Sequence, residues 1–311
     1  QEVIVGLEAD SSKEVKSSLG AVSVDQTDSY KTANALLLVQ YTRFFAPLKD
    51  DGTPVELRRF LQHPSTLSVG LGVVAVTIQD SRNPAAQWEG TGSASLLMLG
   101  GEYYFPTDTG VFLSLGGGSG TFEQTVNGVK QPDTDVSLGM HEFGVRQYVA
   151  PNVELHLALT GESVKSKGGT ESESKTTVTL LGVQGVIRNT VGLFFEIGGG
   201  ERTDQQTGTA DKDYDVTQMN IAIAVYAGNQ LSFRLDVEAE GAKQTGLPAG
   251  FEYTESEAQM TFSAAYWFSE RFGMQLPIYT VTKETKTVVA PIETKRTEKN
   301  SGIGLYAGFR F

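Results

Sequence analysis

The last eleven residues, from Ser301 to Phe311, constrain the fold more than any other part of the chain. They read SGIGLYAGFRF. One face would carry Ile303, Leu305, Ala307, Phe309 and Phe311, and the other Gly302, Gly304, Tyr306, Gly308 and Arg310. A strict period of two with one continuous apolar face is typical of a strand that meets lipid on one side and a wet or small-residue interior on the other. The segment therefore predicts a β-strand that crosses a membrane.

This segment resembles the C-terminal strand of bacterial outer-membrane β-barrels, which commonly end in Phe as an assembly signal. Tyr306 stands where that signal usually has a glycine. The resemblance implies a porin-like, antiparallel up-and-down barrel in the outer membrane of a Gram-negative bacterium. It also implies that the barrel-assembly machinery recognises the C-terminal strand.

Composition narrows the class of protein further. The chain has 311 residues, no Cys and a net charge of −12. It has no run of 18 apolar residues, so we predict no transmembrane helix. Without Cys there are no thiolate metal sites and no cysteine nucleophile. An acidic chain without a basic stripe is also not expected to bind nucleic acid.

The first residues resemble a mature N-terminus. Gln1 is followed directly by the strand-like EVIVGLEAD. We therefore expect that a signal peptide has already been removed.

Alternating segments recur along the chain, and the connections between them alternate between short and long. The short ones are residues 106–110, 150–152, 189–190, 228–230 and 269–272; the long polar ones are 165–175, 202–213, 242–251 and 283–301. Barrels of this class have short periplasmic turns and longer outer loops.

The alternation of short and long connections predicts one all-β domain over residues 1–311. With both chain ends on the periplasmic side, it predicts a barrel of about fourteen strands (between about 12 and 16). The predicted strands are 2–11, 30–45, 65–79, 89–105, 110–124, 134–149, 151–166, 174–188, 190–204, 213–227, 230–243, 251–268, 272–287 and 296–311. Most exceed the roughly 9 to 11 residues that a tilted strand needs to cross a bilayer. We expect the surplus to project outward as hairpins, one of them with a turn at Asn127 and Gly128.

Two segments depart from the strand pattern. Residues 11–28 are polar and are interpreted as a first outer loop, which could also fold inward. Residues 47–64 read PLKDDGTPVELRRFLQHP, in which Pro54 can open one short helix. That helix could cap the barrel end, fold into the pore, or dock a periplasmic partner through Pro54, Glu56, Arg58 and Arg59.

Residues 231–241 carry the clearest lumen signal, because an apolar row there alternates with a charged row. Basic side chains on the lipid face cost about 2 to 4 kcal/mol at mid-depth, so the charged row is expected inside. A half-exposed strand of a soluble sandwich shows the same alternation. The predicted pore-lining residues are Glu154, His156, Glu196, Arg234, Asp236, Glu238 and Arg310.

Aromatic residues gather near the short-turn ends of the strands and predict an interfacial belt. They are Tyr103, Tyr104, Phe105, Tyr148, Tyr226, Tyr266, Trp267, Phe268, Phe309 and Phe311.

The sequence gives little support for an enzyme active site. The three histidines, His63, His141 and His156, have no persuasive serine partner, and GGGSG at 116–120 lacks the lysine of a phosphate loop. Asp211, Asp213 and Asp215 alternate as in calcium loops but lack the glycine turn and the closing Glu. We predict no enzyme activity, no cofactor and no metal site.

The sequence thus favours a monomeric outer-membrane channel for passive diffusion of small polar solutes or ions. An acidic lumen would favour cations. Two alternatives remain open: a barrel scaffold that docks a periplasmic or surface partner, and a soluble secreted β-sandwich that binds glycans.

Overall fold

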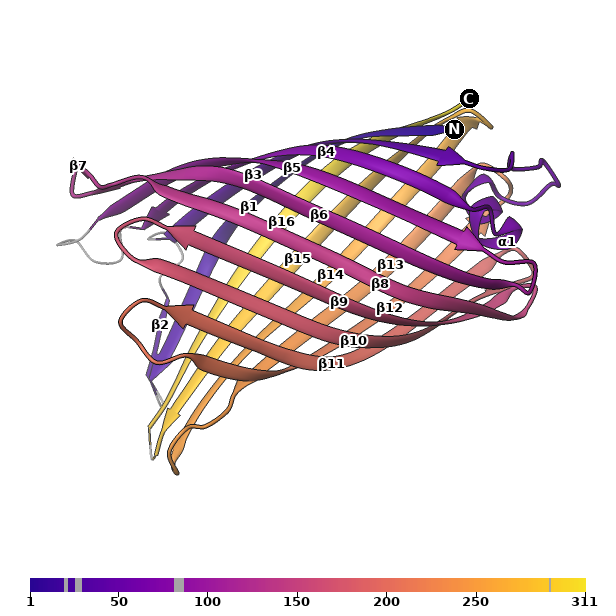
Figure 1. Ribbon diagram of the computed structural model, residues 1–311. Helices are drawn as coiled ribbons and strands as arrows, with labels where there is room; N and C mark the ends of the chain where they lie inside the picture. The colour runs from indigo at the N-terminus through magenta and orange to yellow at the C-terminus, as the bar shows by residue number, and fades with distance from the viewer. Residues whose placement is uncertain (20–21, 26–29, 81–86, 291) are drawn as a thin grey trace.

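The protein folds into a closed antiparallel β-barrel of fourteen long strands (Figure 1). The computed structural model describes residues 1–19, 22–25, 30–80, 87–290 and 292–311. The long strands are β1 (Glu2–Leu19), β3 (Tyr30–Phe44), β4 (Thr66–Asp80), β5 (Trp88–Tyr104), β6 (Thr109–Val126), β8 (Thr134–Ala150), β9 (Val153–Lys167), β10 (Glu171–Ile187), β11 (Val191–Gln206), β12 (Lys212–Ala227), β13 (Leu231–Gln244), β14 (Phe251–Ser269), β15 (Phe272–Val289) and β16 (Ile292–Arg310).

Each long strand pairs with the next one along the chain, and β16 pairs back onto β1. At this seam Glu2 lies opposite Arg310, and the pairing continues to Leu19 opposite Thr294. Closure leaves no unpaired long edge, which is the condition for strands to cross a bilayer. Both termini and the short turns lie at one end of the barrel, with α1 (Figure 1). In barrels of this class that end faces the periplasm.

Two short strands extend the wall at the opposite end. β2 (Val22–Asp25) pairs with β1, and β7 (Val129–Lys130) pairs with β6. The turn before β7 has Asn127 at φ 50° and Gly128 at φ 78°, the positive values that an Asn-Gly hairpin turn requires. The predicted turn is confirmed.

The predicted strand number and the positions of the strands are confirmed, with one correction near the N-terminus. Residues 11–19 continue β1 rather than beginning a loop, and residues 22–25 form β2. Residues 20–21 and 26–29 of that predicted loop lie outside the described residues. The outer part of β16 pairs with this extension beyond a bulge at Ser12 and Glu14, so cross-strand pairing overrides the polar composition.

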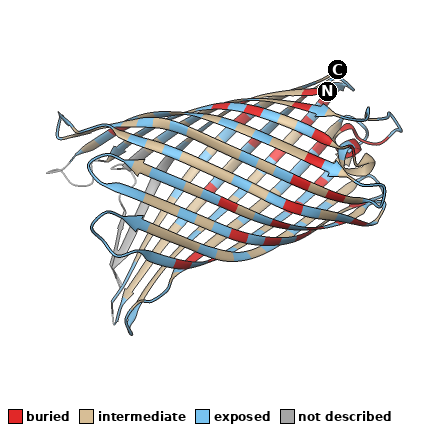
Figure 2. Cartoon of the chain, in the orientation of Figure 1, coloured by how far each residue is buried: buried red, intermediate tan, exposed pale blue. Residues whose placement is uncertain are grey.

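Exposed and less exposed residues alternate along the strands (Figure 2). The exposed face carries large apolar side chains on every side of the barrel, among them Leu71, Leu97, Leu157, Ile197, Leu235, Ile278 and Leu305. A soluble protein does not expose a continuous apolar band of this kind, whereas a lipid-facing barrel wall requires one. Among the residues that the structure describes, no helix is long and apolar enough to span a membrane.

The aromatic belt is correct only in part. Tyr103, Phe105, Tyr266 and Phe268 lie on the exposed face near the periplasmic end. Tyr104, Tyr148, Tyr226 and Trp267 have the opposite parity and point inward, where Tyr148 and Trp267 are buried. Neighbouring aromatic residues on one strand cannot share a face, because the side-chain period is two.

Inward-facing glycines let the wall bend, and the closest overlaps lie on two strands. A Cβ at Gly120 in β6 would overlap the carbonyl oxygen of Ser93, and one at Gly200 in β11 would overlap that of Thr177. Near the bend at β11, an apolar cluster fills part of the interior: Phe112, Ala158, Val178, Leu180, Tyr214, Val216 and Ala242. The interior of the barrel is therefore partly packed.

Candidate functional site: the barrel lumen and its periplasmic mouth

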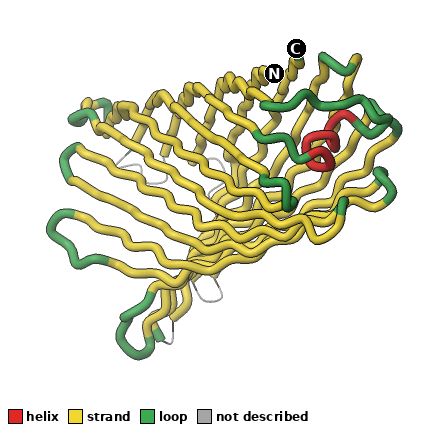
Figure 3. Tube along the Cα trace, turned by 45° about the vertical axis from the view of Figure 1, so that its right-hand side comes forward, coloured by secondary structure: helices red, strands yellow, loops and turns green. Residues whose placement is uncertain are grey.

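Residues 47–64, here called the mouth segment, lie in the periplasmic opening of the barrel (Figure 3). They contain a 3-10 turn, η1 (Val55–Leu57), followed by α1 (Arg58–Gln62), so the predicted short helix is confirmed. Val55 and Leu57 are buried.

The contacts of the mouth segment reach most of the way round the wall. The amide of Val55 donates to the carbonyl of Asn229 in the β12–β13 turn at 3.2 Å, and its carbonyl accepts from Arg310 of β16 at 3.1 Å. The Tyr148 hydroxyl of β8 donates to the carbonyl of Phe60 at 2.9 Å. Arg59 lies 3.6 Å from Glu102 of β5. A segment tied to β5, β8, β16 and the β12–β13 turn spans the opening.

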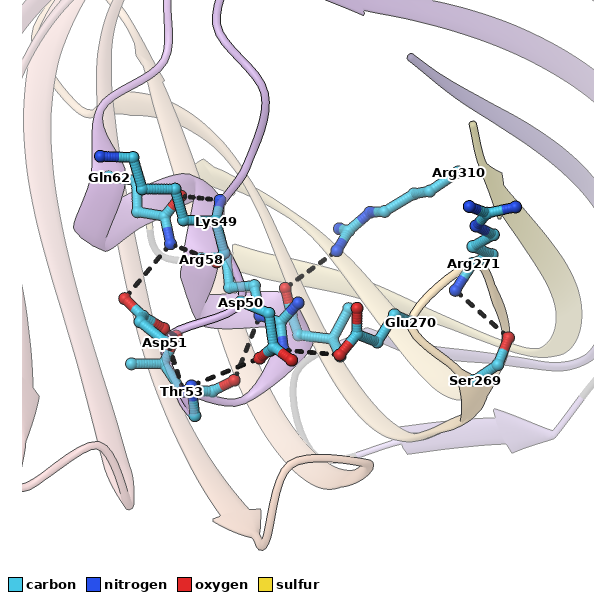
Figure 4. A network of polar contacts seen from close by, with 12 residues as sticks. Lys49, Asp50, Asp51, Thr53, Arg58, Gln62, Ser269, Glu270, Arg271 and Arg310 are labelled. Carbon is cyan, nitrogen blue, oxygen red and sulfur yellow. Dashed lines mark hydrogen bonds and ion pairs between the residues drawn. The ribbon is translucent and has the colours of Figure 1, made fainter.

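Arg58 holds the mouth segment together from within (Figure 4). Its buried guanidinium donates to Asp50 at 2.7 Å and to the carbonyl of Thr53 at 3.3 Å, and it lies 3.7 Å from Glu270 in the β14–β15 turn. A hydrogen bond from Glu270 lowers the pKa of the Asp50 carboxyl, and the same bond raises the pKa of Glu270. As the pH rises, Asp50 therefore loses its proton before Glu270 does and is ionised against Arg58.

His63 ends α1 with a left-handed backbone and packs against aromatic rings of the wall. Its ring stacks on Tyr148 at 3.4 Å between centroids and on Tyr104 at 5.5 Å. Nδ1 lies 3.9 Å from a carboxylate oxygen of Asp108, and Nε2 is buried without a hydrogen-bond partner. Burial lowers the pKa of His63, which the nearby carboxylates of Asp108 and Glu102 only partly oppose.

A network of buried charges lies next to the mouth segment and shares Glu102 with it. Arg146 of β8 lies between Glu102 at 3.1 Å and the fully buried Glu154 of β9 at 3.4 Å. His156 contacts Glu196 of β11 at 2.7 Å through Nε2. The predicted residues Glu154, His156 and Glu196 thus come together on the inner face of β9 and β11, across the intervening β10, each with a charged or titratable partner.

A cavity of about 330 Å³ lies further along the lumen. Four carboxylates, Glu196, Glu238, Glu240 and Glu257, line it together with three amides, and its lining includes no lysine or arginine. A second cavity of about 320 Å³ shares Glu240 and Glu257 and adds paired charges of both signs. One of these pairs, Arg202 of β11 with Glu255 of β14 at 2.6 Å, joins strands that are not neighbours.

Three other predicted lumen residues, Arg234, Asp236 and Arg310, do not belong to the Glu154–His156–Glu196 group. Arg234 and Asp236 share the inner face of β13 and bind each other at 2.8 and 2.9 Å. Arg310 sits at the mouth, where it binds Glu2 at 2.8 Å and stacks over Trp267 at 4.4 Å. It therefore ties the β1–β16 seam to the mouth segment.

The candidate docking residues mostly face the barrel. Pro54 and Arg58 are buried, Arg59 pairs with Glu102, and Glu56 is half-buried. Docking of a partner there stays a prediction. Within the described part of the chain no group of three His, Asp or Glu side chains is placed to hold a metal ion.

Sequence reasoning missed the apolar part of the lumen. Met98 of β5 and Met140 of β8 have inward parity, as do Leu36 and Leu38 of β3 and Val74 and Val76 of β4. These strands are apolar on both faces, so alternation of residue type gives no signal there. Glu162 of β9 and Glu257 of β14 were missed as well, because each lies toward the polar outer end of its strand.

Comparison with known proteins supports the fold. No family model and no curated protein matches the chain. Among solved structures, the toluene transporter TodX of Pseudomonas putida aligns with a TM-score of 0.54 at 10% identity, over 98% of this chain and 89% of TodX. A monoaromatic hydrocarbon channel, a TodX deltaS2 mutant, reaches 0.59 at 10% identity, over 98% and 89%. A FadL homologue of Pseudomonas aeruginosa reaches 0.54 at 8% identity, over 99% and 90%.

At these identities the similarity shows a shared fold. Together with the closed wall and its exposed apolar band, it defines the class: the protein is a β-barrel of the bacterial outer membrane. The predicted fold class and location are confirmed.

Proposed function

We propose that the protein is an outer-membrane channel for passive diffusion of small polar solutes and ions, with a preference for cations. The acidic cavity lined by Glu196, Glu238, Glu240 and Glu257 carries this proposal, because its lining has four carboxylates and no lysine or arginine. Lys283 pairs with Glu257 at 2.7 Å from outside this lining and leaves an excess of negative charge. Carboxylates in a narrow lumen attract cations and repel anions more strongly than they would in bulk water. The mouth segment then acts as the constriction at the periplasmic end.

A second candidate is passage of apolar solutes such as those named for the TodX channels. The inward apolar residues of β3 to β8 favour it. Uptake of toluene and of small sugars into liposomes that hold the protein separates the two: sugar uptake without enhanced toluene uptake supports the first proposal.

Planar-bilayer recording in a salt gradient tests the proposal. We expect steady single-channel conductance and a reversal potential that favours potassium over chloride. Glu238→Lys should shift the reversal potential toward chloride. Glu123→Lys is the matched control, because Glu123 lies beside Lys130 near the β6–β7 hairpin, outside the lumen cavities. A folded barrel that does not conduct, or that prefers chloride, would contradict the proposal.

A further inference from the structure

A third lumen cavity, of about 390 Å³, has a lining of two different kinds. Met98, Met140 and Val178 contribute apolar side chains, and Glu142, Glu162 and Glu240 contribute carboxylates. These residues come from β5, β8, β9, β10 and β13, so one cavity is bounded by strands from widely separated parts of the wall.

The two methionines converge on Gly116 of β6. Met98 and Met140 are its direct cross-strand neighbours, one on each side. A Cβ at Gly116 would lie 2.9 Å from Cε of Met140 and 3.6 Å from Cγ of Met98. The space beside Gly116 is therefore filled by two flexible, polarisable thioethers, which line the cavity and adapt readily to apolar groups of varied shape.

The carboxylates of this cavity lack positive partners. Among the described residues, no basic side chain forms an ion pair with Glu142, Glu162 or Glu240, and the only basic side chain in the cavity lining is the imidazole of His141. Two lumen arginines bind other carboxylates: Arg146 binds Glu102 and Glu154, and Arg202 binds Glu255. Glu240 accepts a hydrogen bond from Gln218 at 2.7 Å through one oxygen only.

The acidic side of this cavity continues into the cavity lined by Glu238 and Glu257, because both cavities include Gln218 and Glu240. There Asn220 presents a buried Oδ1 that has no hydrogen-bond partner. It is a neutral oxygen with partial negative charge beside the carboxylates, and it adds to the attraction for a cation.

We propose that this cavity is a binding site for organic cations, in which an apolar group lies against Met98, Met140 and Val178 while its ammonium group faces Glu162 and Glu240. This assignment rests on the proposed channel and names the class of solute that it selects. A cavity of this volume accommodates a small organic molecule. An inorganic cation would use only the carboxylates.

Block of the potassium current by added cations tests the site. We expect benzyltrimethylammonium to block at a concentration about tenfold lower than tetramethylammonium, because only the former has an apolar group to bury. The neutral benzyl alcohol and the anionic benzoate should not block in that range. Equal block by both cations, or block by benzyl alcohol, would overturn the proposal.

Variants locate the site. Glu162→Gln combined with Glu240→Gln should raise the blocking concentration of both cations by about tenfold. Met98→Gln combined with Met140→Gln should raise it for benzyltrimethylammonium and leave tetramethylammonium unchanged. Glu123→Gln serves as the control, and a heat-modifiable shift on gel electrophoresis checks that every variant is folded. An unchanged benzyltrimethylammonium block in either double variant would contradict the placement.

Equilibrium dialysis of benzyltrimethylammonium against the folded protein in detergent separates this inference from the channel proposal. Saturable binding by a barrel that does not conduct would uphold the site and contradict the channel. Conductance without saturable binding would overturn the site and leave the channel standing.

Discussion

Arg146 illustrates how the lumen tolerates buried charge. Glu154 is fully buried, and Arg146 at 3.4 Å is its guanidinium partner, with the imidazole of His156 at 3.9 Å. A buried carboxylate that loses its only guanidinium partner typically costs about 3 to 5 kcal/mol of folding free energy. The stability of the buried Glu154 carboxylate therefore depends on Arg146.

We expect Arg146→Met to destabilise the barrel by about 3 kcal/mol or more. Urea unfolding in lipid vesicles measures the change. Adding Glu154→Leu should recover part of the loss, because no unpaired charge then remains at that position. Lys130→Met, at the exposed β6–β7 hairpin, is the control. Equal stability of Arg146→Met and the control would show that Glu154 does not depend on Arg146.

His63 makes the docking of the mouth segment sensitive to pH. Its pKa in the docked state lies below the ordinary value of about 6.5, so the docked state resists protonation. Docking is therefore strongest above pH ~6.5 and weakens as the pH falls toward the docked-state pKa.

Acidification below pH ~6.5 should increase open-channel noise and the hydrogen exchange of residues 55–62. His63→Gln, which does not titrate, should show a flatter pH response. An identical pH response in the variant would assign the effect to another group, such as the Asp50–Glu270 pair.

At the scale of single elements, the bend at β11 depends on inward-facing glycines, of which Gly200 is the most crowded. Gly200 points inward with a neighbouring carbonyl where its Cβ would be, whereas the adjacent Gly199 points outward and has Val216 O as its nearest atom at 3.7 Å. The two residues form a matched pair in one strand.

We expect Gly200→Val to reduce the folded fraction strongly and Gly199→Val to leave it nearly unchanged. Backbone atoms of β10 cannot move away from a new side chain without breaking the β10–β11 ladder. Heat-modifiable mobility after refolding into detergent gives the folded fraction. Comparable folding of the two variants would show that the bend relaxes.

The mouth segment is the element that sets how far the periplasmic end is open. Replacing residues 48–63 by a short Gly-Ser connection removes the contacts to Asn229, Tyr148, Arg310 and Glu102 but leaves the strand ladders intact. We expect a higher single-channel conductance with fewer closures. Unchanged conductance would mean that the narrowest point lies deeper, near the Arg202–Glu255 pair.

At the scale of the whole molecule, the barrel wall separates lipid from lumen residue by residue. Leu235 lies on the exposed face of β13, and Glu238, three positions on, lies on the inner face. Leu235→Arg should destabilise the barrel by about 2 to 4 kcal/mol in lipid vesicles. Glu238→Arg should preserve stability and change ion selectivity. Equal destabilisation of the two variants would contradict the assignment of faces.

The sequence by itself determined the strand number, the turn positions and the parity of the clearest strands. Strand alternation and turn chemistry are local, so residues 231–241 and the C-terminal segment are readable without their neighbours. Only the tertiary structure decided which charges pair, where β1 ends, how the mouth segment docks and how Met98 and Met140 share a cavity with Glu162 and Glu240. Those outcomes depend on register and wall curvature, which bring together strands far apart in the chain.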